Sequence, residues 1–252
     1  MPNQELLVRT LVEMADSLVA DFDVVDLLTL LSERCVQTLD VATAGVMLAT
    51  PAGNLAVVAS SSDGMRTLEL FQLQSDEGPC VDCFQTRQPV VNIQLGEAAG
   101  RWPKFAPHAL AAGFQSVHSL PMRLRGATIG ALNMFRKEKG TLGGDDVTAA
   151  QALADVATIA ILQHQAALDA QRLNQQLSGA LQSRILIEQA KGKISESANV
   201  DMDQAFLWLR GHARNHNIRL GDLARDIAEG TIAAGSLDPT NPHSPTGTIC
   251  CG

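Results

Sequence analysis

The chain has 252 residues and a mass of 26.8 kDa, which is enough for two small domains or one larger one. Its formal net charge of −8 and isoelectric point near 5.2 argue against a protein that coats nucleic acid non-specifically. No run of about 18 apolar residues and no targeting segment is visible, so we expect no membrane partner. Five cysteines without a secretion signal predict reduced thiols and a cytoplasmic location.

The N-terminal two thirds of the sequence predict helices around two β-hairpins. Apolar side chains recur at intervals of three and four in residues 4–20, and a second helix follows a capping aspartate, Asp23 or Asp26. Residues 64–73 predict a helix between the hairpins. The predicted strands are residues 44–49, 55–60, 116–124 and 128–135. This order of elements predicts an α+β fold.

A long helix is predicted from Asp145 to Ser178, and because no proline follows it we expect the same helix to run into the first of the C-terminal helices. The part up to Leu162 suits a helix packed on its own sheet. Beyond it, apolar residues recur at spacings of four and three, namely Ala166, Ala170, Leu173, Leu177 and Ala180. Because this is the spacing of a coiled-coil seam, we expect residues 166–180 to pair with a second copy of the chain as a homodimer.

Three short amphipathic patterns follow, which predict a three-helix bundle. The second pattern begins after Asp201, which stands three residues before Gln204 in a variant of the capping box, and the third ends at Gly230. Residues 235–252 contain three prolines and no periodicity, so we expect a disordered tail there.

The three patterns resemble the ANTAR domain, a three-helix RNA-binding module of bacterial antitermination regulators. Ser195 departs from the family pattern, which more often has a bulky apolar residue at that position. The matching residues are Arg184, Ile187 and residues 189–192 in the first helix, Ala205, Phe206, Leu209, Arg210 and Ala213 in the second, and Arg219, Leu220, Leu223 and Ala224 in the third.

Residues 20–165 resemble a GAF domain, a small-molecule sensor fold with an antiparallel sheet between helices. The resemblance rests on the first hairpin and on three short motifs: residues 77–80 (EGPC), 88–91 (QPVV) and 129–133 (IGALN). Together, the two resemblances are closest to the GAF–ANTAR regulators of actinobacteria. The motif by which GAF domains bind cyclic nucleotides is not found.

We therefore expect an α+β protein of four parts. These are a GAF-like sensor domain with N-terminal helices (1–165), a helical coiled-coil linker (166–180), an ANTAR RNA-binding bundle (181–234) and the tail (235–252). The resemblance implies that a structured RNA hairpin binds the bundle and that a small molecule of unknown identity binds the GAF domain. The sequence points to no particular cofactor.

The candidate RNA-binding residues lie on all three C-terminal helices. Arg184 and Lys191 are seven residues apart and share a stripe, although Arg184 could instead simply pair with Glu188. Arginine can bind phosphates and stack on unpaired bases, and a glycine lets a base or backbone approach closely. The full set that the residues and the resemblance imply is Arg184, Ala190, Lys191, Gly192, Arg210, Arg214 and Arg219.

Pro79, Cys80, Cys83 and His118 are the candidates for the neighbourhood of the sensor pocket. The Cys80-x-x-Cys83 pair is not a zinc site by itself, because zinc needs four ligands and there is no second such pair. It is either a redox pair at a helix start or two small packed residues. Phosphate-binding glycine loops, metal-binding histidine pairs and nucleophile elbows are absent from the sequence, so we expect no catalytic residue, no metal and no enzyme activity.

Two other functions remain possible for the C-terminal helices. They could bind DNA through a recognition helix at residues 220–227, or they could bind a protein partner. Against DNA, the third helix has Asp222, Asp226 and Glu229 beside a single basic residue, Arg225, and this negative charge would repel the phosphates of a major groove.

Overall fold

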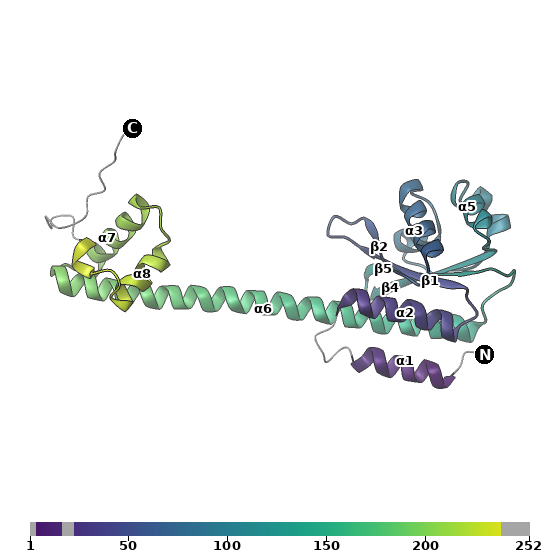
Figure 1. Ribbon diagram of the computed structural model, residues 1–252, viewed down its shortest axis with the longest axis horizontal. Coiled ribbons are helices and arrows are strands. Elements are labelled where there is room, and N and C mark those ends of the chain that lie inside the picture. Colours follow the sequence, from purple (N-terminus) through teal and green to yellow (C-terminus); the bar gives the residue numbers. More distant parts are fainter. Residues whose placement is uncertain (1–3, 17–22, 238–252) are drawn as a thin grey trace. The chain divides into compact units, whose positions relative to one another are not determined.

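The computed structural model describes residues 4–16 and 23–237, which divide between Ala167 and Leu168 into two compact units (Figure 1). The N-terminal unit is an α+β domain, and the C-terminal unit is helical. No helix of the described residues is long and apolar enough to cross a membrane.

A five-stranded antiparallel sheet forms the centre of the N-terminal unit, with strand order β2-β1-β5-β4-β3. The four strands predicted from the sequence are confirmed. The edge strand β3 is additional: it has only five residues, and its pairing with β4 is interrupted between Val90 and Ile93, where Asn92 has a φ of 58°. The strands are β1 (Thr43–Ala49), β2 (Leu55–Ser60), β3 (Val90–Gln94), β4 (Ser116–Leu124) and β5 (Ala127–Arg136).

Helices cover both faces of this sheet (Figure 1). One core lies between the sheet and α1 (Gln4–Asp16), α2 (Val24–Thr38) and the start of α6 (Gly144–Ala198). The other lies between the sheet and α3 (Asp63–Ser75), α4 (Pro79–Thr86), the 3-10 helix η1 (Leu95–Gly100) and α5 (Phe105–Ala111). The predicted arrangement of an antiparallel sheet between helices is confirmed.

The caps of these helices follow from short polar side chains. Of the two candidate aspartates, Asp23 is the one that caps α2, because its carboxylate accepts a hydrogen bond from the backbone N–H of Val25 at 2.6 Å. Ser62 caps α3 in the same way, through the N–H of Met65. The predicted first helix ends at Asp16 as α1, and the remainder of the prediction, residues 17–20, lies outside the described residues.

Helix α6 has 55 residues and continues past Ser178 into the first helical pattern of the bundle, as predicted. Its buried residues up to Ile161 pack on the sheet, also as predicted, and include Leu153 and Ala157. Beyond residue 165 its side chains are exposed as far as Gln182. No proline interrupts the helix between the sheet and the bundle, so the first helix of the bundle is the end of α6.

The C-terminal unit packs the end of α6 against α7 (Met202–Asn215), α8 (Leu220–Glu229) and the 3-10 helix η2 (Ala234–Leu237). Asp201 caps α7 by accepting a hydrogen bond from the N–H of Gln204 at 2.7 Å, and Gly230 ends α8 with a φ of 84°. The predicted start of the tail needs correction, because residues 235–237 belong to η2 and Leu237 is buried in the core. The rest of the predicted tail, 238–252, lies outside the described residues.

Candidate nucleic-acid interface and sensor core

Arg184 and Lys191 lie on one stripe of α6 but have different surroundings. Arg184 is exposed and takes part in no ion pair with any described residue. Glu188, which could have paired with it, pairs with Lys191 instead, with Nζ 3.0 Å from Oε2. The Lys191 side chain is only 15% exposed, and its ammonium lies 5.6 Å from the centroid of the Phe206 ring. Arg184 is therefore the cation that remains available to a partner.

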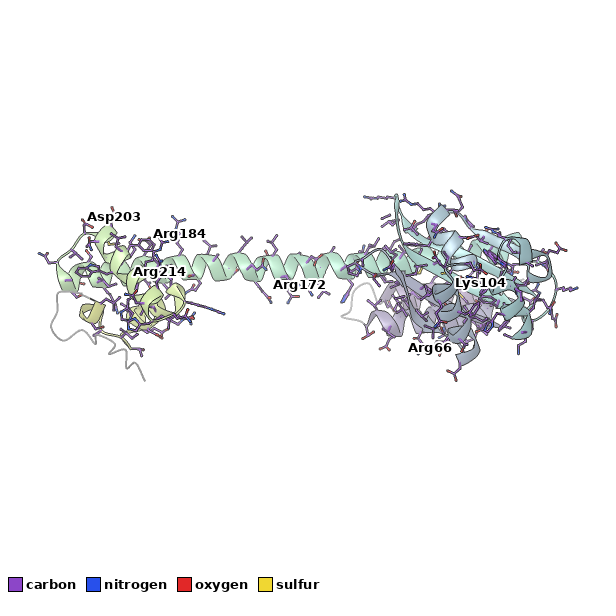
Figure 2. The ribbon with its side chains drawn as sticks, turned by 90° about the horizontal axis from the view of Figure 1, so that it is seen from above. Arg66, Lys104, Arg172, Arg184, Asp203 and Arg214 are labelled. Carbon is purple, nitrogen blue, oxygen red and sulfur yellow. The ribbon has the colours of Figure 1, made fainter. Side chains whose placement is uncertain are left out.

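A second basic stripe continues from the contact between Lys191 and Phe206. Arg210 and Arg214 follow Phe206 at intervals of four, so all three share one flank of α7. Both arginines are exposed, and neither forms an ion pair within the described part of the chain. Figure 2 shows Arg184 and Arg214, one from each stripe, on this unit. The contact between Lys191 and Phe206 is where the two stripes meet.

Gly192, next to Lys191, faces open space. A Cβ atom added there would have no neighbour within 4 Å, whereas one added at Gly221 would lie 2.7 Å from the Oγ of Ser183. Gly221 thus allows α8 to approach α6 closely, but nothing inside the chain requires a glycine at position 192. The free space at this position is on the outside of the bundle.

The other predicted residues are less favourably placed. Ala190 is fully buried in the core of the bundle, so an RNA contact by its side chain is not possible in this structure; it is a packing residue. Arg219 is exposed at the N-cap position of α8. Farther along α8, Arg225 pairs with Asp222 at 3.6 Å, so the one basic residue within this helix is partly neutralised.

Three contacts in the bundle were not predicted from the sequence. Lys193 donates a hydrogen bond to the carbonyl oxygen of Ala228 at 2.8 Å and so ties α6 to α8. His212 and His216 stack at the end of α7 with ring centroids 4.0 Å apart, and partial burial, followed by the charge of His216, lowers the pKa of His212. Ser195, the departure from the ANTAR pattern, donates a hydrogen bond to the carbonyl of Val200 at 2.6 Å and so gives this carbonyl, in the turn after α6, a partner.

The four candidate pocket residues of the N-terminal unit do not share one site. Side chains alternate along β4, so Val117 and Ser119 face the core with Cys80 and Cys83, whereas His118 and Leu120 face the core with α2 and α6. The expectation that His118 lies beside the cysteines is therefore corrected: the sheet separates them. Pro79, Cys80 and Cys83 do lie together, and all three are buried in α4.

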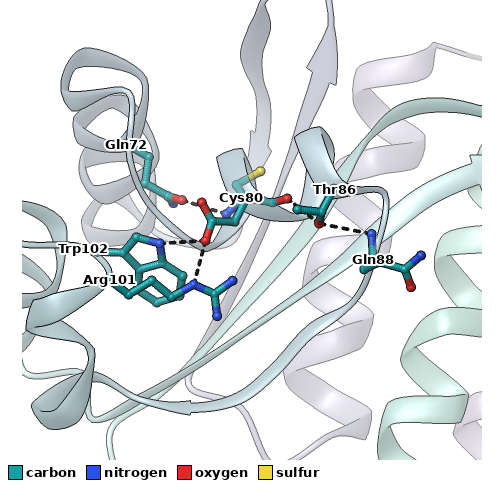
Figure 3. Close-up of polar contacts among 7 residues, drawn as sticks. Gln72, Cys80, Thr86, Gln88, Arg101 and Trp102 are labelled. Carbon is teal, nitrogen blue, oxygen red and sulfur yellow. Dashed lines mark hydrogen bonds and ion pairs between the residues drawn. The ribbon is translucent and has the colours of Figure 1, made fainter.

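Burial keeps the thiols of this unit protonated. It raises the pKa of Cys80 well above its ordinary value and that of Cys83 to about 11, and in the other core it raises the pKa of Cys35 to about 12. Figure 3 shows how α4 is held: the Oε1 of Gln72 accepts a hydrogen bond from the N–H of Cys80, and Asp82 binds both Arg101 and Trp102. The Cys80-x-x-Cys83 pair is therefore built as packing and not as a reactive thiol pair.

A buried carboxyl group lies on the same face of the sheet. Glu69 of α3 is fully buried and accepts a hydrogen bond from the hydroxyl of Ser60 at 2.5 Å, with the amide of Asn133 at 3.5 Å. Burial raises its pKa to about 7, and the hydrogen bonds from Ser60 and Asn133 oppose this rise. The glycine at position 45 is required here, because a Cβ atom would lie 2.5 Å from the Oε1 of Glu69.

His118, in the other core, is held as a neutral ring. Its Nδ1 accepts a hydrogen bond from the backbone N–H of Asn92 at 2.9 Å. Burial, and after it the charge of Arg136, lowers the pKa of His118 to about 4. No group of three or more histidine, cysteine, aspartate or glutamate side chains in the described ranges could hold a metal ion.

Comparison with known proteins identifies the fold and two domain families. Solved structures of the same fold include a GAF domain of a phosphoenolpyruvate-protein phosphotransferase from Coxiella burnetii (16% identity, TM-score 0.50, covering 65% of this chain and 97% of that one). Another is a domain of a putative two-component sensor histidine kinase from Sinorhizobium meliloti 1021 (12% identity, TM-score 0.50, covering 60% and 99%). A third, described only as a GAF domain, is 14% identical with a TM-score of 0.51 and coverages of 64% and 89%.

The family models identify the chain more specifically than these folds do. No curated protein matches it. The model of the GAF domain matches residues 23–162, which is more than half of the chain, and the model of the ANTAR domain matches residues 175–227. The chain therefore belongs to the GAF family, and with the ANTAR domain that follows it is a GAF–ANTAR regulator.

Proposed function

We propose that this protein controls transcription antitermination in the cytoplasm by binding structured RNA hairpins through its ANTAR domain. GAF and ANTAR domains are regulatory, and together they support a signal-responsive RNA-binding regulator. We propose no enzymatic activity for either. A small molecule bound to the GAF domain is the proposed signal, and a homodimer that pairs residues 166–180 is the proposed form of the regulator.

One observation carries the proposal: basic side chains of α6 and α7 form two stripes that meet at the contact between Lys191 and Phe206, next to the open space at Gly192. Arg184, Arg210 and Arg214 are exposed and unpaired among the described residues. Such guanidinium groups can bind phosphates in a hairpin stem and stack on bases of its loop. The space directly over Gly192 is open, since a Cβ atom there would have no neighbour within 4 Å. We therefore propose RNA contacts for Arg184, Lys191, Gly192, Arg210, Arg214 and Arg219, and not for Ala190.

DNA is the less favoured target. The exposed part of α8 would have to enter the major groove, and it has Asp222, Asp226 and Glu229 there. Arg225 is the only basic residue within that helix, and it is paired with Asp222. Like charges at phosphate distance would oppose this docking.

Filter binding tests the proposal, with the full chain mixed with a structured hairpin RNA, with duplex DNA of the same sequence or with no nucleic acid. Retention of the hairpin in preference to the duplex is expected, with an affinity that falls as the salt concentration rises. Equal retention of the duplex would favour the DNA alternative. Retention of neither nucleic acid would favour the alternative in which the bundle binds another protein.

A further inference from the structure

We propose that the N-terminal unit binds a phosphorylated small molecule in a hollow lined by three arginines. This hollow is separate from the core that contains Cys80 and Cys83. The hollow has a volume of about 620 Å³. It lies between the end of α4, the turn from β4 to β5 and one turn of α6, all in the N-terminal unit. Its lining comprises Thr86, Arg87, Gln88, Arg123, Leu124, Arg125, Gly126, Thr128, Asp155 and Ile159.

Two of the three arginines, Arg87 and Arg123, are held in place without being neutralised. Arg123 donates a hydrogen bond from Nη1 to the carbonyl oxygen of Arg87 at 3.2 Å, and Arg87 donates one from Nη1 to the carbonyl of Gly126 at 3.4 Å. A guanidinium has five N–H donors, so each of these groups keeps most of its donors free. None of the three arginines forms an ion pair with a residue that the structure describes.

The charge of the lining differs from that of its surroundings. Asp155 is the only carboxylate among the lining residues, and it accepts a hydrogen bond from Gln151 at 2.7 Å. Three positive charges thus face one negative charge, although residues 1–177 as a whole have 12 basic and 19 acidic side chains. Cations that gather in an acidic domain without acidic partners indicate an anionic ligand.

The chemistry of the lining favours phosphate, and its size favours a small molecule. Guanidinium groups bind phosphate oxygens in pairs, through two parallel hydrogen bonds. Small-molecule sites have volumes of roughly 300 to 1,000 Å³ and combine apolar walls with a few polar groups. Leu124 and Ile159 supply apolar wall, so the ligand that fits best has a phosphate group and an apolar part.

The backbone presents two of the arginines in an uncommon conformation. Arg87 and Arg125 have φ angles of 60° and 57°, in the left-handed region that glycine or asparagine adopts more readily. At the turn this conformation falls on Arg125, although Gly126 is the next residue. At Arg87 this conformation belongs to the C-cap of α4, and at Arg125 it belongs to the turn between β4 and β5, so backbone turns bring both residues to the hollow.

An effect of the bound anion on RNA binding rests on the proposed function, whereas the binding of the anion in the hollow does not. Asp155 and Ile159 belong to α6, so a bound anion would contact this helix directly. If the ANTAR domain responds to changes in α6, the hollow is a place where a signal could enter. Binding of the anion can be measured with no RNA present.

Calorimetric titration of the full chain with inorganic pyrophosphate and with AMP tests the site. Arg125→Asn removes the charge, and asparagine tolerates the backbone conformation. We expect this variant to bind about tenfold more weakly, the effect of one lost charged hydrogen-bonding group. Asp155→Asn should bind more tightly, a gain that unfolding cannot produce. Arg66→Gln, which changes an exposed arginine on α3, should leave the affinity unchanged. Tighter binding of AMP than of pyrophosphate would identify the apolar wall as part of the site.

Two outcomes overturn the proposal. In both of them pyrophosphate and AMP bind neither the wild-type protein nor Asp155→Asn. In the first, Arg125→Asn also has no effect on binding of a hairpin RNA; in the second, Arg125→Asn weakens that binding, which would make the hollow an RNA contact. Hairpin binding that survives the first outcome leaves the proposed function intact. Conversely, loss of hairpin binding with intact phosphate binding contradicts only the proposed function.

Discussion

Arg184 is the residue at which RNA binding can be tested with the least damage to the fold. It is exposed and unpaired among the described residues, so Arg184→Ala should weaken binding of a hairpin RNA and leave the melting temperature unchanged. Loss of one phosphate contact should also reduce the slope of log affinity against log salt by about one unit. Filter binding at several salt concentrations measures both effects.

Arg225→Ala is the matched control, since Arg225 is paired with Asp222 on the acidic side of the bundle. It should leave the RNA affinity and the salt slope unchanged. Lys191→Ala is less clean, because it also removes the contact with Phe206 and should lower the melting temperature. Equal effects of Arg184→Ala and Arg225→Ala on RNA binding would contradict the assignment of the interface.

Glu69 should make the N-terminal unit less stable as the pH rises. Its pKa is about 7 in the folded state and 4.5 ordinarily, so between these pH values the folded chain binds a proton that the unfolded chain has released. The stabilisation is complete below pH 4.5 and is lost as the pH rises through 7, and the full loss is about 3 kcal/mol. Urea unfolding at pH 5 and pH 8 tests this: the free energy of unfolding of the wild type should fall relative to that of Glu69→Gln, which stays neutral at both pH values. An equal change in the two proteins would mean that Glu69 is not responsible.

His118 should have the opposite effect at lower pH. Its pKa of about 4 is below the ordinary value of 6.5, so the unfolded chain binds the extra proton. The stabilisation from the neutral ring is complete above pH 6.5 and is lost as the pH falls through 4. In His118→Asn, the Oδ1 of the new side chain can accept the hydrogen bond from Asn92 in place of Nδ1. Urea unfolding at pH 6.5 and pH 5 should therefore show that the wild type loses stability relative to this variant as the pH falls, and an equal change in the two proteins would contradict the role of His118.

Residue roles that depend on local sequence could be predicted, and those that depend on packing could not. Asp23 and Asp201 are caps whose partners are two to three residues away, so the pattern alone indicates them. Lys191 and Phe206 meet only because α6 and α7 pack together. His118 was grouped with Cys80 because nothing in the sequence says which face of a strand meets which helix.

At the scale of elements, the exposed middle of α6 is the segment that we expect to pair with a second copy of the chain. Leu173 and Leu177 are each 55% exposed, and Leu181 is 64% exposed. Apolar side chains that recur along one helix at spacings of three and four are typical of a coiled-coil seam. We therefore expect Leu173→Asp to weaken the homodimer, because paired aspartates at a seam repel each other. Light scattering at tens of micromolar should shift from the mass of a dimer toward that of a monomer.

Gln175→Asp is the control for this variant. Residue 175 lies two positions farther along α6, about 200° around the helix from residue 173 and therefore away from the seam. It adds the same charge to the same stretch and should leave the mass unchanged. A monomeric wild-type protein at this concentration, unaffected by Leu173→Asp, would contradict the coiled coil.

Elements with a strong period were predicted well, and one short element was not. The burial of α6 up to Ile161 agrees with the change of pattern near Leu162. The continuation of α6 into the first helical pattern of the bundle is also predictable, because no proline interrupts the sequence there. The five-residue strand β3 is too short and too irregular for a period to be visible.

At the scale of the whole molecule, the sequence motifs identified two domain types, while the ligand chemistry required the structure. The GAF and ANTAR matches agree with the resemblance seen in short motifs. The arginine-lined hollow joins residues from three separated segments, 86–88, 123–128 and 155–159, so no local pattern could predict it. A signal bound in the N-terminal unit must affect RNA binding through some physical link, and α6 is the continuous element common to both units.

Insertion of two residues after Gln171 tests whether α6 is that link. No proline interrupts the helix, and Gly179 is the only glycine between the insertion point and Arg184. Two residues rotate everything downstream by about 200° relative to the upstream part, whereas seven residues add nearly two full turns and restore the phase. A ligand that favours one arrangement of paired helices by a few kcal/mol would lose its effect in the first variant and keep it in the second. We therefore expect the two-residue insertion, but not the seven-residue one, to change the RNA affinity or its response to pyrophosphate or AMP. If both insertions behave like the wild type in filter binding, the two units are a sensor and a binder joined by a passive tether.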